Sequence, residues 1–318
     1  MRSPATPQPA HGAAPPDAAG LEFGGVPPRP AAAPPARLVV ATFNVRYAVG
    51  SFLISGSLLR RFGLSRPGRR ARLVARHIER AARALSDGSL MPPADLVALQ
   101  EADRGTLRAG LRHVARELAE AAGMSYVRAG VPTPRDVGPK KKQWYLDFEE
   151  QMRLGEEGDT GVALLGRVPL GDAARVELPW HECAWRPRLA LAATTPLGRA
   201  RLHVFNLHID PHAKLGDQFE QHRAVLEMAE TADGPVVLLG DFNTLSRRSC
   251  VAAREFLEAR GYATPLPTGT GTWRAGPLRL HADWIFTRGL RVRRWGVARG
   301  LSVSDHWPVW AEVEAGGD

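Results

Sequence analysis

The chain has 318 residues, 44% of them apolar, which is enough to build a sizeable core in one large domain or two. Two cysteines, Cys183 and Cys250, are too few for a disulfide framework, so a reducing compartment, the cytoplasm, is expected. A net charge of +9 favours acidic partners such as nucleic acid, anionic lipid or phosphorylated metabolites, although a compositional bias toward Arg, Ala, Gly and Pro accounts for part of that charge.

The first 36 residues differ in composition from the rest. They hold ten of the 26 prolines and show no sustained apolar period, so we expect residues 1–36 to be a disordered Pro/Ala-rich tail and residues 37–318 to form the folded domain. No apolar segment of the secretory type follows the first Arg, and no run of about 18 apolar residues occurs. The sequence therefore predicts neither a secretion signal nor a membrane span.

The next part of the chain alternates apolar runs with helical patterns. It predicts strands over 38–45 and 95–100, and helices over 72–85 and 106–122. Asn44 lies at the end of the first strand, where it could either ligate a metal or phosphate oxygen or simply begin a turn. Glu101 ends the second strand, where it suits a metal site or the N-terminus of the following helix.

Two stretches leave alternatives open. Residues 48–70 mix apolar and basic side chains, which suits a substrate-facing loop, a membrane-surface element or a solvated arginine-rich connection. In residues 128–159, the run from Lys140 to Tyr145 interleaves charge with aromatic rings, which is typical of phosphate contact and base stacking. A charged loop with one buried aromatic residue explains the same run.

The second half repeats the alternation. It predicts strands over 161–167, 186–191, 202–208, 236–239, 283–286 and 290–297, a last strand from 309, and helices over 218–229 and 249–260. Asn206 and His208 are two residues apart at a strand end, so their side chains share one face. His212, His222 and Asp210 lie nearby, as in some zinc sites, but their spacing fits no zinc pattern.

The segment from Val236 to Thr244 joins a buried apolar strand to two polar side chains. Asp241 and Asn243 follow the apolar run at i and i+2, so they project to the same side of an extended chain. A carboxylate beside an amide suits a hard divalent cation and a positioned water. The same four residues, Gly-Asp-x-Asn, are also good turn chemistry.

Six predicted strands thus carry an Asn, Asp, Glu or His at one terminus. Their order along the chain is Asn44, Glu101, His208, Asp241-x-Asn243, Asp283 and Asp305-His306. This order over residues 38–314 resembles the endonuclease/exonuclease/phosphatase family, which includes deoxyribonuclease I, repair nucleases, neutral sphingomyelinases and inositol polyphosphate 5-phosphatases. Residues 161–167 also resemble a family strand, with Gly166 where Ser is usual. The resemblance implies an α/β fold, a four-layer α/β sandwich of two mixed β-sheets packed face to face with helices outside.

The resemblance also implies a divalent-metal-dependent hydrolase of phosphate esters. Glu101, with Asn44 and Asp305, would hold Mg²⁺ or Mn²⁺. Asn206 and Arg188 would bind the substrate phosphate, although Arg188 is equally well explained as an ordinary strand-edge arginine.

The remaining residues would act on the scissile bond. Asp241, steadied by Asn243, would position and deprotonate water. His306 would contact the phosphate, with Asp283 fixing its tautomer. His208 would bind phosphate or protonate the leaving oxygen.

Three functions remain open from the sequence. The first is a nuclease acting on DNA or RNA. The second is a phosphatase or phosphodiesterase for lipid head groups or soluble phosphorylated metabolites. The third is a non-catalytic phosphate-binding protein, which is disfavoured because every expected catalytic position is filled. A monomer is expected in each case.

Overall fold

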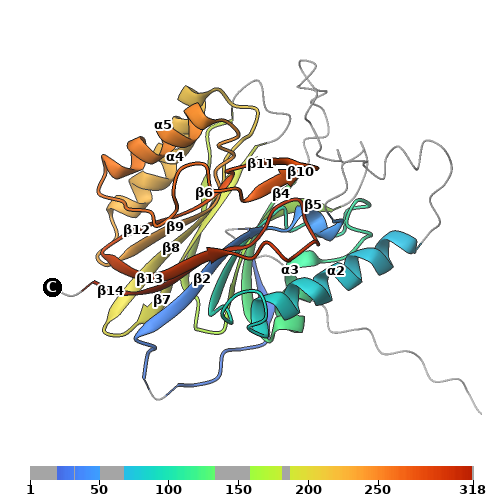
Figure 1. Cartoon of the computed structure of the whole chain (residues 1–318). Helices are drawn as coiled ribbons and strands as arrows, with labels where there is room; N and C mark the ends of the chain where they lie inside the picture. The colour runs from blue at the N-terminus through green and yellow to red at the C-terminus, as the bar shows by residue number, and fades with distance from the viewer. Residues whose placement is uncertain (1–19, 32, 51–67, 133–157, 181–186, 317–318) are drawn as a thin grey trace, which may run out of the picture.

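Two β-sheets face each other in the middle of the molecule, and helices cover their outer faces (Figure 1). The structure is a computed structural model, and it describes residues 20–31, 33–50, 68–132, 158–180 and 187–316. The predicted four-layer α/β sandwich is confirmed. Much of the two ambiguous stretches, 48–70 and 128–159, lies outside the described residues, as do Lys140–Tyr145 and Cys183.

The larger sheet has seven strands. Their spatial order is β1 (Leu21–Gly25), β4 (Ser125–Pro132), β5 (Asp159–Gly166), β3 (Leu96–Gln100), β2 (Arg37–Asn44), β14 (Val309–Ala315) and β13 (Leu290–Val297). The smaller sheet has five strands, in the order β12 (Asp283–Arg288), β9 (Val236–Asp241), β8 (Ala200–His208), β7 (Leu189–Leu197) and β6 (Gly171–Glu177). A short hairpin, β10 (Trp273–Ala275) with β11 (Leu278–Leu280), forms a separate ribbon.

The helices divide between the two sheets. Their bounds are Arg69–Ser86 for α2, Val114–Ala122 for α3, Leu215–Glu230 for α4 and Arg247–Glu258 for α5, with a short turn η1 at Arg46–Ala48. Helices α2 and α3 lie beside the larger sheet, and α4 and α5 lie beside the smaller one (Figure 1). No helix within the described ranges has both the length and the apolar character needed to cross a bilayer.

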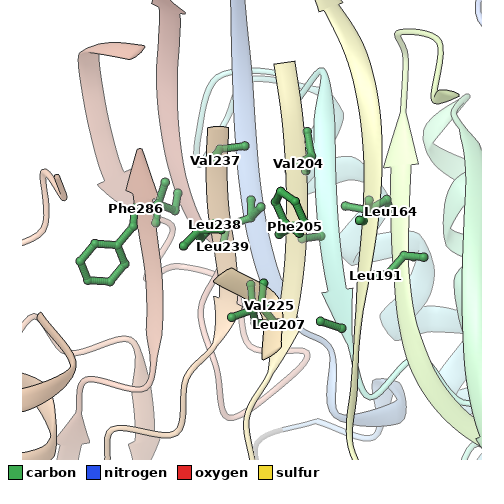
Figure 2. Packing of buried hydrophobic residues seen from close by; sticks show 14 of the residues in the cluster. Leu164, Leu191, Val204, Phe205, Leu207, Val225, Val237, Leu238, Leu239 and Phe286 are labelled. Carbon is green, nitrogen blue, oxygen red and sulfur yellow. The ribbon is translucent and has the colours of Figure 1, made fainter. Parts of the chain in front are cut away.

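The core forms because strands of both sheets are buried on two faces. In β2, Val40 packs into the cluster between the sheets, whereas Phe43 packs into a second cluster against α2 and α3. The first cluster continues through the smaller sheet toward α4 and α5, and it includes Leu164, Phe205 and Leu238 (Figure 2). Continuous apolar runs are therefore required in the central strands.

Parallel pairing sets the edge at which polar residues gather. β2 runs parallel to β3, which places Asn44 beside Gln100. β8 runs parallel to β9, which places His208 beside Asp241. Since parallel strands end at the same edge of a sheet, the side chains that follow these four strands lie together.

Two antiparallel strands bring further polar residues to this edge. β12 begins where β9 ends, so Asp283 pairs with Asp241. β14 begins where β2 ends, with Val309 beside Thr42, and this places the preceding His306 at the same edge.

The sequence predicts a strand that ends before Gly240. In the structure, β9 continues through Gly240 to Asp241. A Cβ at Gly240 would lie 2.0 Å from the carbonyl oxygen of Leu207 in β8. Glycine is required here because the two backbones approach too closely for a side chain.

The prediction that residues 1–36 are a disordered tail is wrong for the part that the structure describes. β1 pairs antiparallel with β4 at the edge of the larger sheet, and Leu21 and Glu22 are both buried. The composition of residues 1–36 does not reveal β1, because a strand of only five residues leaves no sustained apolar pattern. Pairing with β4 and one buried carboxylate hold this strand in place.

The predicted helix over 106–122 is shorter than expected and begins at Val114. The residues before it form turns in which Gly105, Gly110 and Leu111 have positive φ. Arg108 forms a buried ion pair with Asp103 there, at 2.6 Å. The other three predicted helices are confirmed, with ends displaced by one to three residues.

Candidate active site

His306 and Asp283 form a buried dyad. The His306 Nδ1 atom lies 2.9 Å and 3.1 Å from the two carboxylate oxygens of Asp283. Asp283 is fully buried, so its carboxylate faces the ring and not solvent. This geometry holds a proton on Nδ1 and turns Nε2 toward the pocket side of the ring.

Burial alone would lower the pKa of His306. The negative charges of Asp283 and Asp241 outweigh it and raise that pKa to about 10. The imidazole is therefore a cation near neutral pH, which suits it to hold an anionic phosphoryl oxygen.

Asp241 lies beside this dyad. One of its carboxylate oxygens is 3.8 Å from Nε2 of His306 and accepts a hydrogen bond of 2.9 Å from the side chain of Asn44. Burial and the charge of Asp283 raise the pKa of Asp241 to about 7 overall, against the opposing effects of His306 and Asn44. A carboxylate whose pKa lies near neutrality is suited to accept a proton from water.

Asn243 supports Asp241 through its backbone. Its N–H donates to the second oxygen of Asp241 at 2.9 Å, and its side-chain amide donates to the carbonyl of Ile209 at 2.7 Å. Its φ of 51° is unusual for a residue with a side chain, and Asn tolerates this conformation better than most. The steadying role predicted for Asn243 thus has a concrete geometry.

Asn44 joins the two sheets by binding two carboxylates. Its side-chain N–H₂ donates to Glu101 at 3.2 Å and to Asp241 at 2.9 Å. Its oxygen accepts from the backbone N–H of Arg46 at 3.0 Å, which fixes which end of the amide is which. Asn44 therefore orients the carboxylates, and this placement is at odds with the metal-ligand role expected for it.

Glu101 follows β3 and reaches the pocket. Its φ is 52°, and its side chain is 13% exposed, more than the other carboxylates at this edge. It lies 3.9 Å from Nε2 of His208. An accessible carboxylate held at a strained backbone position is the best placed group here to hold a cation.

Asp305 is held by three neighbours. It accepts from the indole N–H of Trp273 at 3.1 Å and from the hydroxyl of Ser304 at 3.2 Å. Arg46 lies 3.4 Å away as an ion-pair partner. Asp305 reaches the site as predicted, but its charge is already partly balanced by a protein cation.

His208 and Arg188 come together on the smaller sheet. The Arg188 guanidinium donates toward the His208 ring, with 2.9 Å between Nη1 and Nε2. Both side chains are buried and both line the pocket. The structure therefore places Arg188 in the site and not at an ordinary strand edge.

Asn206 does not reach the pocket. It is fully buried, and its amide donates to the carbonyls of Leu99 and Ala163 at 2.9 Å and 2.8 Å. Its oxygen accepts from Gln100 at 2.7 Å. These bonds join β8 to β3 and β5 across the two sheets, which is at odds with the substrate-binding role expected for Asn206.

The polar edge opens into a pocket of about 720 Å³. Its buried side carries the carboxylates and histidines, and its outer side carries the first residues of α4 and α5 and the β10–β11 hairpin. The lining residues outside the predicted site include Arg46, Lys214, Gln218, Arg248, Trp273 and Leu280.

Sequence reasoning missed Arg46 and Trp273. Arg46 stands only two residues after Asn44, but it lies in a turn with positive φ, where the i, i+2 rule for extended strands does not apply. Trp273 belongs to a three-residue strand, too short for any periodic signal.

The residues present fit a hard divalent cation. Oxygen donors from Glu101 and Asp305 face the pocket, as Mg²⁺ and Mn²⁺ require. Asp241, Asp283 and His306 also group their ligand atoms within 4.8 Å of one another. Asp283 faces the imidazole with both oxygens, however, so these three residues are better described as a hydrogen-bonded pair beside a carboxylate than as a metal cage.

Comparison with known proteins agrees with this arrangement. The family described as "Endonuclease/Exonuclease/phosphatase family" matches residues 41–306. The chain belongs to this family. No curated protein matches significantly.

Solved structures of the family share the fold. An endonuclease/exonuclease/phosphatase from Beutenbergia cavernae is 20% identical with a TM-score of 0.58, over 89% of this chain and 72% of that one. A mannosyl-6-phosphatase from Bacteroides thetaiotaomicron is 19% identical with a TM-score of 0.53, over 87% and 99%. TDP2 from D. rerio, complexed with single-strand DNA product, is 17% identical with a TM-score of 0.54, over 88% and 100%.

Proposed function

We propose that this protein is a divalent-metal-dependent phosphoesterase and acts as a phosphodiesterase of the nuclease type. The observation that carries the proposal is the buried Asp241 carboxylate beside the cationic Nε2 side of His306, at the wall of an open pocket. A base and a fixed cation 3.8 Å apart are what attack of water on a phosphate ester needs.

We assign to Asp241 the task of orienting and deprotonating the attacking water. Asn44 and the backbone of Asn243 occupy defined lone pairs of the carboxylate, which fixes the direction of the remaining ones. A water in the pocket can then donate to Asp241 only along these remaining directions. The proton released when that water attacks phosphorus passes to Asp241.

We assign to His306 the task of binding the scissile phosphoryl group. Asp283 holds Nδ1–H, so Nε2–H is left to donate to a non-bridging oxygen. Arg188 and His208, from the other sheet, bind the phosphate or the leaving oxygen. The buried Asp283 keeps the imidazole charged throughout the reaction.

Glu101, together with Asp305, would hold a Mg²⁺ or Mn²⁺ ion. When bound, such an ion neutralises charge that develops on the phosphorus oxygens. Asn44 fixes the Glu101 carboxylate at 3.2 Å, so the chain preorganises this ligand without the ion.

A polyanionic substrate is supported by charge. The chain carries a net charge of +9, and the outer side of the pocket adds the exposed cations Lys214 and Arg248. A phosphodiester strand places further phosphates beyond the scissile one, where these cations lie. The proposal includes a cytoplasmic, monomeric enzyme, for which size-exclusion chromatography and cell fractionation are the tests.

The test is a panel of substrates assayed with Mg²⁺, with Mn²⁺ and with EDTA. The panel holds plasmid DNA, single-stranded RNA, sphingomyelin, phosphatidylinositol phosphates, a soluble sugar phosphate and a bis-aryl phosphodiester. We expect hydrolysis of the nucleic acids and the aryl diester, and none in EDTA. Cleavage confined to lipid head groups or phosphomonoesters would contradict the nuclease assignment, and full activity in EDTA would contradict the metal.

A further inference from the structure

Arg46 follows β2 at the active-site edge and enters the pocket wall from the larger sheet. Its side chain is about 6% exposed yet lines the same pocket as Glu101 and Asp241. Burying a guanidinium is costly unless the surroundings compensate for its lost hydration. Its position therefore calls for a reason.

The backbone that carries Arg46 is held in an uncommon conformation. Arg46, Tyr47 and Ala48 have φ values of 45°, 41° and 58°, three successive positive values without a glycine. The turn is held by hydrogen bonds from Tyr47 N–H to the Glu101 carbonyl at 3.1 Å and between His77 Nδ1 and the Ala48 carbonyl at 2.8 Å. Such strain persists where the surroundings fix it, and it concentrates at functional sites.

The guanidinium lies among the carboxylates expected to attract a cation. Nη1 donates to the Gly50 carbonyl at 3.2 Å and lies 3.4 Å from Asp305. Burial acts to lower the pKa of Arg46, but the negative charges of Asp305 and Glu101 raise it overall. Arg46 thus supplies positive charge where a second metal ion would otherwise be drawn.

We propose that Arg46 is a phosphate-binding catalytic residue that takes the place of a second divalent ion, so that the enzyme works with one ion, held at Glu101 and Asp305. This inference rests on the proposed function. Arg46 from the larger sheet and Arg188 from the smaller one both line the pocket that contains Asp241. A phosphate between them would meet fixed guanidinium groups from both sheets, whose planar N–H pattern matches phosphoryl oxygens.

The alternative is a purely structural ion pair that neutralises Asp305. Asp305 already accepts hydrogen bonds from Trp273 and Ser304, so it does not depend on Arg46 alone for partners. A structural pair would also be served by Arg46 sealed away from the pocket, whereas Arg46 lines the pocket.

The experiment compares Arg46→Met and Arg46→Lys with Arg167→Met. Arg167 is a matched control, because its guanidinium is also partly buried and donates to Ala94 at 3.0 Å and Ser86 at 2.7 Å, outside the active-site pocket. Binding of inorganic phosphate is measured by calorimetry in metal-free buffer. Binding of Mn²⁺ alone is measured by electron paramagnetic resonance, and folding by thermal melting.

The wild-type chain should bind phosphate without metal and saturate with one Mn²⁺ ion. Arg46→Met should weaken phosphate binding by at least about tenfold, because a charge-assisted contact is lost, and should admit a second Mn²⁺ in the space that the guanidinium leaves. Arg46→Lys should bind phosphate at an intermediate level and keep one Mn²⁺. Arg167→Met should match the wild-type chain in both measurements.

Tight binding of two Mn²⁺ ions by the wild-type chain would overturn the inference, and so would unchanged phosphate binding in Arg46→Met. If Arg46→Met fails to fold, Arg46→Ala assayed with and without millimolar guanidinium chloride decides the matter, since restored phosphate binding supports the inference and no restoration opposes it. Failure of the proposed function looks different: the binding results would hold while no phosphate ester in the panel is cleaved.

Discussion

The active site and the group of polar side chains around Glu22 in β1, which we call the β1 cluster, contain the same kinds of buried side chain. The pKa values of their carboxylates nevertheless shift in opposite directions. In the β1 cluster, Glu22 accepts from Tyr126 at 2.7 Å, lies 2.6 Å from His113 and pairs with Arg104 at 3.2 Å. Burial opposes ionisation there, but the hydrogen bonds from His113 and Tyr126 lower the pKa of Glu22 to about 2.

Asp241 is more deeply buried and has fewer compensating charges. Its hydrogen bonds come from an amide and a backbone N–H, and its histidine partner is 3.8 Å away. Burial and the nearby Asp283 raise its pKa to about 7. The comparison indicates that close charged partners turn a buried acid into a stabilising group, whereas their absence leaves it ready to exchange a proton.

Replacing the reactive acid gives the largest expected effect. Asp241→Asn should lower kcat on the order of ten-thousandfold, because the proton acceptor is lost. The melting temperature should not fall, since a buried group whose pKa is raised opposes folding once it is ionised. Steady-state kinetics and thermal melting above about pH 7 measure the two effects. Substantial activity in this variant would assign the base elsewhere.

The dyad should behave as one unit. Asp283→Asn is expected to lower kcat by roughly two to four orders of magnitude, because the imidazole loses its fixed tautomer and its charge. Asp283→Asn combined with His306→Ala should be scarcely worse than His306→Ala alone. A double-mutant cycle measures this coupling, and losses that multiply fully would mean that Asp283 serves only to cap β12.

Glu101→Gln should lower activity by at least about a hundredfold while leaving the fold intact, because it removes the charge that holds the cation. The loss should be partly recovered at high Mn²⁺ concentration, since weakened binding responds to mass action. A titration of activity against Mn²⁺ measures it. Wild-type metal dependence in this variant would place the ion elsewhere.

Deleting residues 1–36 should lower the free energy of unfolding by roughly 5 kcal/mol, because Leu21 burial and the Glu22 contacts are lost together. Deleting only residues 1–19 serves as the control. Because that segment is rich in Pro and Ala, we expect its deletion to leave the free energy of unfolding unchanged. Chemical denaturation of the two shortened chains measures the difference. Equal stabilities would mean that β1 contributes little to the fold.

Glu22→Gln should cost less, about 3 kcal/mol near neutral pH, and should leave kcat unchanged below the melting transition. The folded-state pKa of Glu22, about 2, lies below its usual value of 4.5. The stabilisation is therefore present above pH 4.5 and is lost as the pH falls from 4.5 toward 2. Melting curves across that window should show the variant and the wild-type chain converging, and a constant gap would contradict the assignment.

The periodicity of the sequence predicted the site residues that lie at the end or the start of a strand. Buried apolar runs located most of the central strands, and the polar residues that follow them had to meet at one edge. The dyad of Asp283 and His306 was predicted by the family resemblance, and its contact distance bears this out.

Depth along a strand could not be predicted. Asn206 and His208 do share a face, as a period of two requires, but Asn206 lies two residues, about 7 Å, farther from the edge. There the opposite sheet closes over it and uses its whole amide. The orientation of the Asn44 amide likewise depends on the backbone N–H of Arg46, which belongs to a turn that no periodic pattern reveals.

The left-handed backbone at Arg46, Glu101 and Asn243 restricts how this edge can change over evolution or in a laboratory library. At each of these positions a β-branched replacement would be rejected by the main chain before its chemistry could be tried. Glycine would relax the chain and favour folding while deleting the functional group. Selection for thermal stability alone should therefore enrich inactive variants with glycine at these three positions. Libraries aimed at new substrates should instead vary the outer wall of the pocket.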